Sequence, residues 1–206
     1  MIILLLLCYT STDLRFHKRK DQLNNHMKLQ DLSESKAKEQ LKLVELPYSM
    51  SALEPIMERK VLEFHYNVLS KGYVDRYNRG EGDPEFNRAG ALLHNLWWPQ
   101  LQKPKVNNRP RGKVMDLMDK AHGGWDEFKD TFTETALALQ GSGWCYMAKN
   151  GEIKTLKNQS WRSDVLMPID LWEHSYTPFT LRKDYLKTIW RIIDWDVINH
   201  RLSGVL

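Results

Sequence analysis

Two different periods of apolar and polar residues divide the chain into a first part with helical spacing and a second part with mixed spacing. In the segment IMERKVLEFHYNVLSKGYVDRYN (56–78), apolar side chains recur at roughly helical intervals. They are Val61, Leu62, Phe64, Val68 and Leu69. The turn-forming cluster GEGDPE (80–85) separates this segment from a second helical pattern, FNRAGALLHNLWWPQL (86–101), which Pro99 ends. The pattern therefore predicts a long helical hairpin.

The second part begins after KPKVNNRPRG (103–112), whose prolines and asparagines indicate a linker. Two short helices are expected on either side of Gly123-Gly124. The segment 143–158 predicts a β-hairpin that turns at Asn150-Gly151, and VLMPID (165–170) predicts a third strand. A terminal helix is expected over 185–202. The predicted fold is α+β: an N-terminal long helical hairpin, then an α/β half with a small three-stranded antiparallel sheet.

These patterns predict three parts: an extension or targeting segment (1–44), a hairpin domain (45–104) and a C-terminal α/β domain (105–206). The extension includes a helix-like tract, SESKAKEQLKLVE (33–45). Its apolar run IILLLL (2–7) is far shorter than the roughly 20 residues that span a membrane, so no transmembrane span is expected. The basic cluster after that run is compatible with a mitochondrial presequence, which places the protein on the matrix side of the mitochondrion.

Composition adds little to this prediction of the fold and its parts. The 206 residues carry a formal charge of +4, too weak to indicate nucleic-acid binding by itself. The two cysteines, Cys8 and Cys145, form no metal-binding pattern, and one pair would make a meagre disulfide framework. A reducing compartment is therefore favoured.

Four residues are candidate metal ligands. His65 and His94 each lie on one predicted hairpin helix, and Asp170 and His174 lie four residues apart in IDLWEHSYTPF (169–179). Three imidazoles and one carboxylate suit a first-row ion such as manganese or iron. A single histidine on an apolar helix face is more often an ordinary core or surface residue, however. Spacing alone therefore leaves both interpretations open.

Five segments in order resemble the iron/manganese superoxide dismutase family over about residues 46–202. They are LPYSMSALEPIMERKVLEFHYNVLSKGYVDRYN, ALLHNLWW, LQGSGWCYM, IDLWEHSY and DYLKTIWRIIDWDVINHRL. The resemblance implies that His65, His94, Asp170 and His174 bind one manganese or iron ion per chain. It also implies that the protein converts superoxide to oxygen and hydrogen peroxide.

The resemblance assigns further residues around the metal. Tyr73 corresponds to the tyrosine of the substrate channel, and Gln159 to the glutamine that bonds the metal's solvent ligand. Gly90 together with Gln159 is the manganese-type arrangement, so manganese is favoured. The walls of the site are assigned to Trp98, Trp144 and Trp172. Glu173 is placed at the interface of a homodimer or a heterodimer with a related chain.

Several positions depart from the family pattern. Leu69 and Ser70 replace a pair of histidines that is frequent in the family, and Thr177 replaces a tyrosine of the subunit interface. One interpretation is a working, divergent dismutase with a rearranged dimer. The alternative is a dismutase-like structural subunit of a large mitochondrial assembly, a ribosomal small subunit or a respiratory complex, with reduced or no activity. A third is nucleic-acid contact through HKRK (17–20) and KPKVNNRPRGK (103–113).

Overall fold

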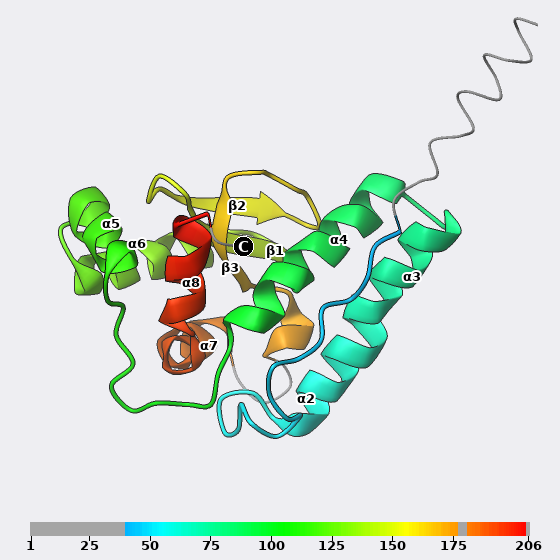
Figure 1. Ribbon diagram of the computed structural model, residues 1–206, viewed down its shortest axis with the longest axis horizontal. Coiled ribbons are helices and arrows are strands. Elements are labelled where there is room, and N and C mark those ends of the chain that lie inside the picture. The colour runs from blue at the N-terminus through cyan, green and yellow to red at the C-terminus, as the bar shows by residue number, and fades with distance from the viewer. Residues whose placement is uncertain (1–39, 177–180, 205–206) are drawn as a thin grey trace, which may run out of the picture. The chain divides into compact units, whose positions relative to one another are not determined.

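The computed structural model describes residues 40–176 and 181–204, and the chain from Leu41 onward forms one compact unit (Figure 1). Nearly all of the predicted extension, with Cys8 and the apolar run at 2–7, lies outside the described residues. So does Thr177. Among the described residues, no helix combines the length and the apolar character needed to cross a membrane.

The predicted helical hairpin is confirmed. Its first arm consists of α2 (Arg59–Phe64), the π-helical segment η1 (His65–Ser70) and α3 (Lys71–Arg79), and its second of α4 (Pro84–Trp97) and the 3-10 turn η2 (Trp98–Gln100). Gly80 ends the first arm in the left-handed conformation, with φ of 70°. Asp83 then caps the second arm by accepting a hydrogen bond from the backbone N–H of Phe86. The arms run side by side in Figure 1, and α3 contacts α4.

The apolar pattern identified the first helix but not all of its buried face. Leu62 is fully buried, whereas Phe64 and Val68 are 51% and 54% exposed. The face that turns inward carries His65 and Ser70 instead, both completely buried. The helix therefore uses polar residues on part of its inner side, which is expected where those residues have partners there.

The helix-like tract at 33–45 is not helical over its described part, because residues 40–46 have no regular secondary structure. Two asparagines of the hairpin hold this stretch. The side chain of Asn78 both accepts from the N–H of Leu41 and donates to its carbonyl. Asn95 accepts from the N–H of Val44 and donates to the carbonyl of Lys42. Backbone groups that a helix would pair internally are thus bound by side chains.

The second half contains the predicted helices and sheet. Two helices, α5 (Lys113–His122) and α6 (Trp125–Ala138), precede strands β1 (Gly143–Ala148), β2 (Ile153–Lys157) and β3 (Val165–Asp170). The strands are antiparallel in the order β2-β1-β3, which puts Pro168 on an edge strand, where proline costs no ladder hydrogen bond. Strand β3 also contacts α4, and this contact brings the hairpin against the sheet (Figure 1).

The prediction of a single terminal helix over 185–202 is wrong. The segment contains α7 (Arg182–Thr188), the 3-10 turn η4 (Ile189–Ile192) and α8 (Trp195–Leu202). Ile193 is extended and forms a β-bridge with Leu101, and the side chain of Asp194 caps α8 by accepting from the N–H of Asp196. When an aspartate side chain can cap a new helix, its hydrogen bond competes with the backbone hydrogen bonds that would continue the preceding helix.

Candidate metal centre

Four elements bring the predicted ligands to one point. His65 begins the π-helical segment, His94 lies in α4, Asp170 ends β3, and His174 lies in the short 3-10 turn η3 (Glu173–Ser175). One candidate ligand atom from each residue lies within 4.8 Å of the others. The side chains of the first three are completely buried, and that of His174 is 19% exposed.

The distances between the ligand atoms suit one ion. His65 Nε2 lies 2.9 Å from His94 Nε2 and 3.2 Å from His174 Nε2. Asp170 Oδ2 lies 3.1 Å from Nε2 of His65 and 3.7 Å from Nε2 of His94 and of His174. Donors bound about 2.1 Å from a shared ion, at angles of 90° to 120°, would lie roughly 3.0 to 3.6 Å apart.

The hydrogen bonds of the ligands leave lone pairs facing the centre. His94 Nδ1 lies 2.6 Å from the carbonyl oxygen of Gly90, which can only accept, so Nδ1 carries the proton and Nε2 offers its lone pair. Asp170 Oδ1 accepts from the backbone N–H of Trp172, whereas the completely buried Oδ2 makes no hydrogen bond of good geometry. Such a carboxylate oxygen is costly to bury without a cation, so the residues present fit a metal ion.

The protonation states also favour metal binding. Burial lowers the pKa of His94 to about 3 and lowers that of His65, so both imidazoles are neutral at physiological pH. Burial acts to raise the pKa of Asp170, but the nearby rings of His174 and His65 outweigh it and hold that pKa below its usual value. Neutral imidazoles and an ionised carboxylate are the forms that bind metals.

The two residues assigned beyond the ligands lie together beside the cluster. Gln159 Nε2 donates to the hydroxyl oxygen of Tyr73 at 3.2 Å, and Gln159 Oε1 accepts from Trp144 Nε1 at 3.0 Å. The ring of Tyr73 stacks on that of His94, with centroids 5.4 Å apart. Burial raises the pKa of Tyr73, which keeps its hydroxyl protonated.

The three predicted tryptophans surround the histidines. Trp98 packs edge-on against His65 with centroids 4.7 Å apart, and Trp144 packs edge-on against His94 at 5.1 Å. Both are completely buried. Trp172 lies beside His174 at 5.8 Å and is partly exposed. These rings exclude water from most of the ligand cluster.

Glu173, which the resemblance assigns to a subunit interface, lies at the surface. Its side chain is 53% exposed, accepts a hydrogen bond from Ser142 Oγ and lies 3.6 Å from Arg182 Nη2. Arg182 also donates to the carbonyl oxygens of Leu139, Gly141 and Leu171. These contacts tie the described residues before position 177 to those that follow position 180.

Sequence reasoning missed the part that Ser70 plays, noting it only as a lost histidine. Its hydroxyl accepts from Trp98 Nε1 at 3.1 Å and donates to the carbonyl oxygen of His65 at 2.9 Å. Ser70 therefore joins a wall tryptophan to the first ligand's backbone. The indole beside His65 was the available signal, since a buried N–H needs an acceptor.

Gly90 has a steric role that the resemblance did not reveal. A Cβ at this position would lie 2.7 Å from ring atoms of Tyr73, closer than real Cβ contacts. The absent side chain gives Tyr73 its place between Gly90 and Gln159. A glycine inside a predicted helix, opposite another helix, was the signal for such a close approach.

Comparison with known proteins agrees with this geometry. The family model "Iron/manganese superoxide dismutases, C-terminal domain" matches residues 110–201, and "Iron/manganese superoxide dismutases, alpha-hairpin domain" matches residues 40–84. A superoxide dismutase [Mn/Fe] of Porphyromonas gingivalis is 34% identical over 188 residues, covering 77% of this chain and 97% of its own length.

Two further relatives carry different metals in their names. A superoxide dismutase [Fe] of Bacteroides fragilis is 31% identical over 76% of this chain and 96% of its own length. A mitochondrial superoxide dismutase [Mn] of Onchocerca volvulus is 31% identical over 77% of this chain and 85% of its own length. The chain belongs to the iron/manganese superoxide dismutase family, and the three relatives described here are all named as superoxide dismutases.

Proposed function

We propose that this protein disproportionates superoxide at the cluster of His65, His94, Asp170 and His174. In the overall reaction, two superoxide anions and two protons give one molecule of oxygen and one of hydrogen peroxide. A manganese or iron ion bound by these four residues supplies the one-electron redox chemistry. The observation that carries the proposal is the convergence of three imidazoles and a completely buried carboxylate oxygen that lacks a good hydrogen bond.

In this proposal, Tyr73 offers a proton to the reactant, and Gln159 holds the Tyr73 hydroxyl in the orientation that makes this proton available. Because Gln159 Nε2 already donates to the Tyr73 oxygen, the phenolic proton of Tyr73 points elsewhere and is available to a reactant. The bond from Trp144 Nε1 fixes the amide of Gln159, so that its NH₂ group faces Tyr73. The raised pKa of Tyr73 keeps that proton in place at neutral pH.

Manganese is the metal we favour. The Gly90 and Gln159 arrangement supports it, because the glycine leaves room for Tyr73 and the amide comes from the segment after β2. Relatives with either metal in their names are similar to this chain, so the choice rests on the arrangement. Reconstitution with each ion in turn, followed by activity measurement, would distinguish them.

Two further properties belong to the proposal. We place the protein in the mitochondrion, which the name of the Onchocerca volvulus relative and the basic residues after the apolar run support. We also propose a dimer through the Glu173 region. The exposed Phe64 and Val68 on the adjacent hairpin arm support it, because a second copy would cover them. Light scattering on wild type and Glu173→Ala tests the dimer.

The architectural alternative predicts a different result. The three relatives described above are all named as dismutases, and a purely structural subunit has no need of a buried, poorly bonded carboxylate. Purified full-length protein, reconstituted with manganese or iron, should accelerate superoxide decay. Asp170→Asn, which keeps the side chain's shape and removes its charge, should abolish both activity and metal retention. Equal activity in the two proteins would contradict the proposal.

A further inference from the structure

Two ligands of the metal centre, His65 and His94, are held in different ways. His94 Nδ1 is bonded to the carbonyl oxygen of Gly90, and this bond fixes the orientation of the His94 ring. The corresponding nitrogen of His65 is buried and makes no hydrogen bond to any residue that the structure describes. The orientation of the His65 ring therefore depends on the side chains that pack around it.

Packing against Trp98 supplies this orientation. Three rings stand edge-on to the His65 ring, those of His174, Trp98 and His94, with centroids 4.4, 4.7 and 5.0 Å away. His174 and His94 belong to the ligand cluster, whereas Trp98 does not. Trp98 is completely buried, so its indole fills the space beside the imidazole. An indole that turned or shifted would therefore change the position of His65.

Ser70 holds this indole in place. Its hydroxyl oxygen accepts a hydrogen bond from Trp98 Nε1 at 3.1 Å, and its single proton is donated to the carbonyl oxygen of His65 at 2.9 Å. Ser70 ends the π-helical segment that His65 begins, and this wider turn brings its side chain back to that carbonyl group. The contacts form a closed circuit from the backbone of His65, through Ser70 and Trp98, to the imidazole of His65.

Burial alone does not account for the bond between Trp98 and Ser70. Trp97 is also completely buried, yet its indole nitrogen makes no hydrogen bond to a described residue. The two completely buried indoles that pack edge-on against a ligand histidine are each bonded to a polar side chain. Trp98 donates to Ser70, and Trp144 donates to Gln159. The indoles beside the ligands are therefore fixed more firmly than the indole of Trp97.

We propose that Ser70 is a positioning residue for the metal centre, acting through Trp98 on the orientation of His65. The inference deepens the proposed function and rests on its metal site, but it does not depend on turnover of superoxide. Without the Ser70 hydroxyl, the buried indole N–H would lack its acceptor, and the indole would shift toward another one. The His65 ring, which has no hydrogen bond of its own at Nδ1, would move with it.

The affinity of the full chain for manganese(II), measured by competition with a chelator, tests this role. Ser70→Ala should weaken the affinity roughly tenfold, as expected for a group that supports a metal ligand. In a Trp98→Phe background, which keeps an aromatic ring and lacks the indole N–H, Ser70→Ala should cost less than about twofold. Equal losses in the two backgrounds would show that Ser70 does not act through Trp98, and would overturn the proposal.

The matched control is Ser175→Ala. Ser175 is also a buried serine and follows the ligand His174 directly, but its hydroxyl makes no hydrogen bond to a described residue. This substitution should leave the affinity for manganese(II) unchanged. A loss as large as that in Ser70→Ala would show a general effect of removing a buried hydroxyl, and unchanged affinity in Ser70→Ala would show that no positioning occurs. Either result would overturn the proposal.

The electron paramagnetic resonance spectrum of bound manganese(II) separates ligand geometry from a general loss of stability. The spectrum should change in Ser70→Ala and match wild type in Ser175→Ala, and an unchanged spectrum in Ser70→Ala would contradict the proposal. This comparison decides the question even where Trp98→Phe does not fold. Wild type that binds manganese(II) without accelerating superoxide decay would contradict the proposed function alone, whereas wild type that binds no manganese(II) would overturn both.

Discussion

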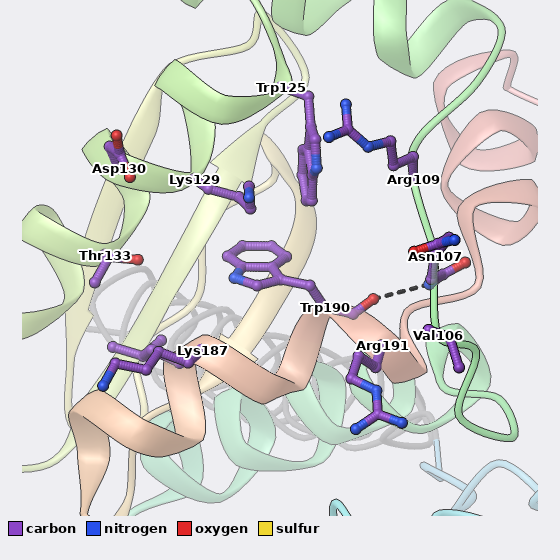
Figure 2. A pocket seen from close by; sticks show the side chains of 12 residues that line it. Val106, Asn107, Arg109, Trp125, Lys129, Asp130, Thr133, Lys187, Trp190 and Arg191 are labelled. Carbon is purple, nitrogen blue, oxygen red and sulfur yellow. Dashed lines mark hydrogen bonds between the residues drawn. The ribbon is translucent and has the colours of Figure 1, made fainter.

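The metal centre and a pocket in the C-terminal half both gather polar side chains, but they differ in burial. The pocket lies beside the linker at 106–109, and its lining includes Trp125, Trp190 and four cationic side chains (Figure 2). At the metal centre, His65, His94 and Asp170 have no exposed surface, whereas the cations of the pocket reach solvent. Buried polar groups without partners cost several kcal/mol each, so the metal centre makes folding depend on its ion. Exposed charges are screened by water and salt, so the cations of the pocket do not make folding depend on a bound ion.

Of the changes considered, metal removal should have the largest effect on the stability of the protein. Chelation of the loaded protein should lower its stability by about 2.7 kcal/mol for an ion present at 100 times its Kd. Thermal unfolding with and without chelator measures the change. Asp170→Asn provides the reference, because chelator should produce no further shift in a protein that retains no ion. Identical unfolding curves for loaded and chelated wild type would contradict the difference between the two regions.

Acid should lower the stability of the metal-free protein, because the same ligand side chains are buried in it. The pKa of His94 is about 3 in the folded chain against an ordinary value of 6.5. Between these values the unfolded chain binds a proton that the folded chain does not, so stability falls as the pH drops from about 6.5 toward 3. Asp170, whose pKa is also lowered, acts in the same direction. Urea unfolding of metal-free protein across this range tests the sign, and stability that rises toward acid would contradict it.

Gln159→Leu should reduce activity by roughly 10- to 100-fold while the ion is retained. The substitution leaves the Tyr73 oxygen and Trp144 Nε1 without their amide partner but keeps all four ligands. Activity per bound metal separates this outcome from simple metal loss. Ser160→Ala, at the exposed next residue, is the matched control and should have wild-type activity.

Substitution of alanine at two glycines should have the smallest effects on stability, and the two effects should have opposite signs. Gly90→Ala pushes a methyl group against the ring of Tyr73 and should cost about 1 to 3 kcal/mol. At Gly72, in α3, the added methyl would meet only the flexible end of Arg76, and Gly72→Ala should stabilise the helix by up to about 1 kcal/mol. Chemical denaturation of both variants measures the difference. A stabilising Gly90→Ala would show that the close approach to Tyr73 has no cost.

The sequence predicts the fold well for a physical reason. Helical and strand periods follow from which faces are buried, and the motif resemblance supplied the long-range order that periodicity lacks. The four ligands lie as far as 109 residues apart in the chain, and their convergence could not be read from spacing. The structure brings them together as predicted.

Other features depend on contacts that no local pattern records. The interruption at Ile193 and Asp194 arises from pairing with Leu101, far away in the sequence. Residues 40–46 have no regular secondary structure, and Asn78 and Asn95 bind their backbone instead. The pocket beside the linker at 106–109 combines that linker with α6 and η4, which lie far apart in the sequence.

The most direct test of the account is the metal content of natively purified protein, measured by elemental analysis together with its size in solution. The account predicts about one manganese or iron ion per chain, bound in a small oligomer. A protein that lacks both ions, or that co-migrates with a much larger particle, would contradict it and favour an architectural use of the dismutase fold.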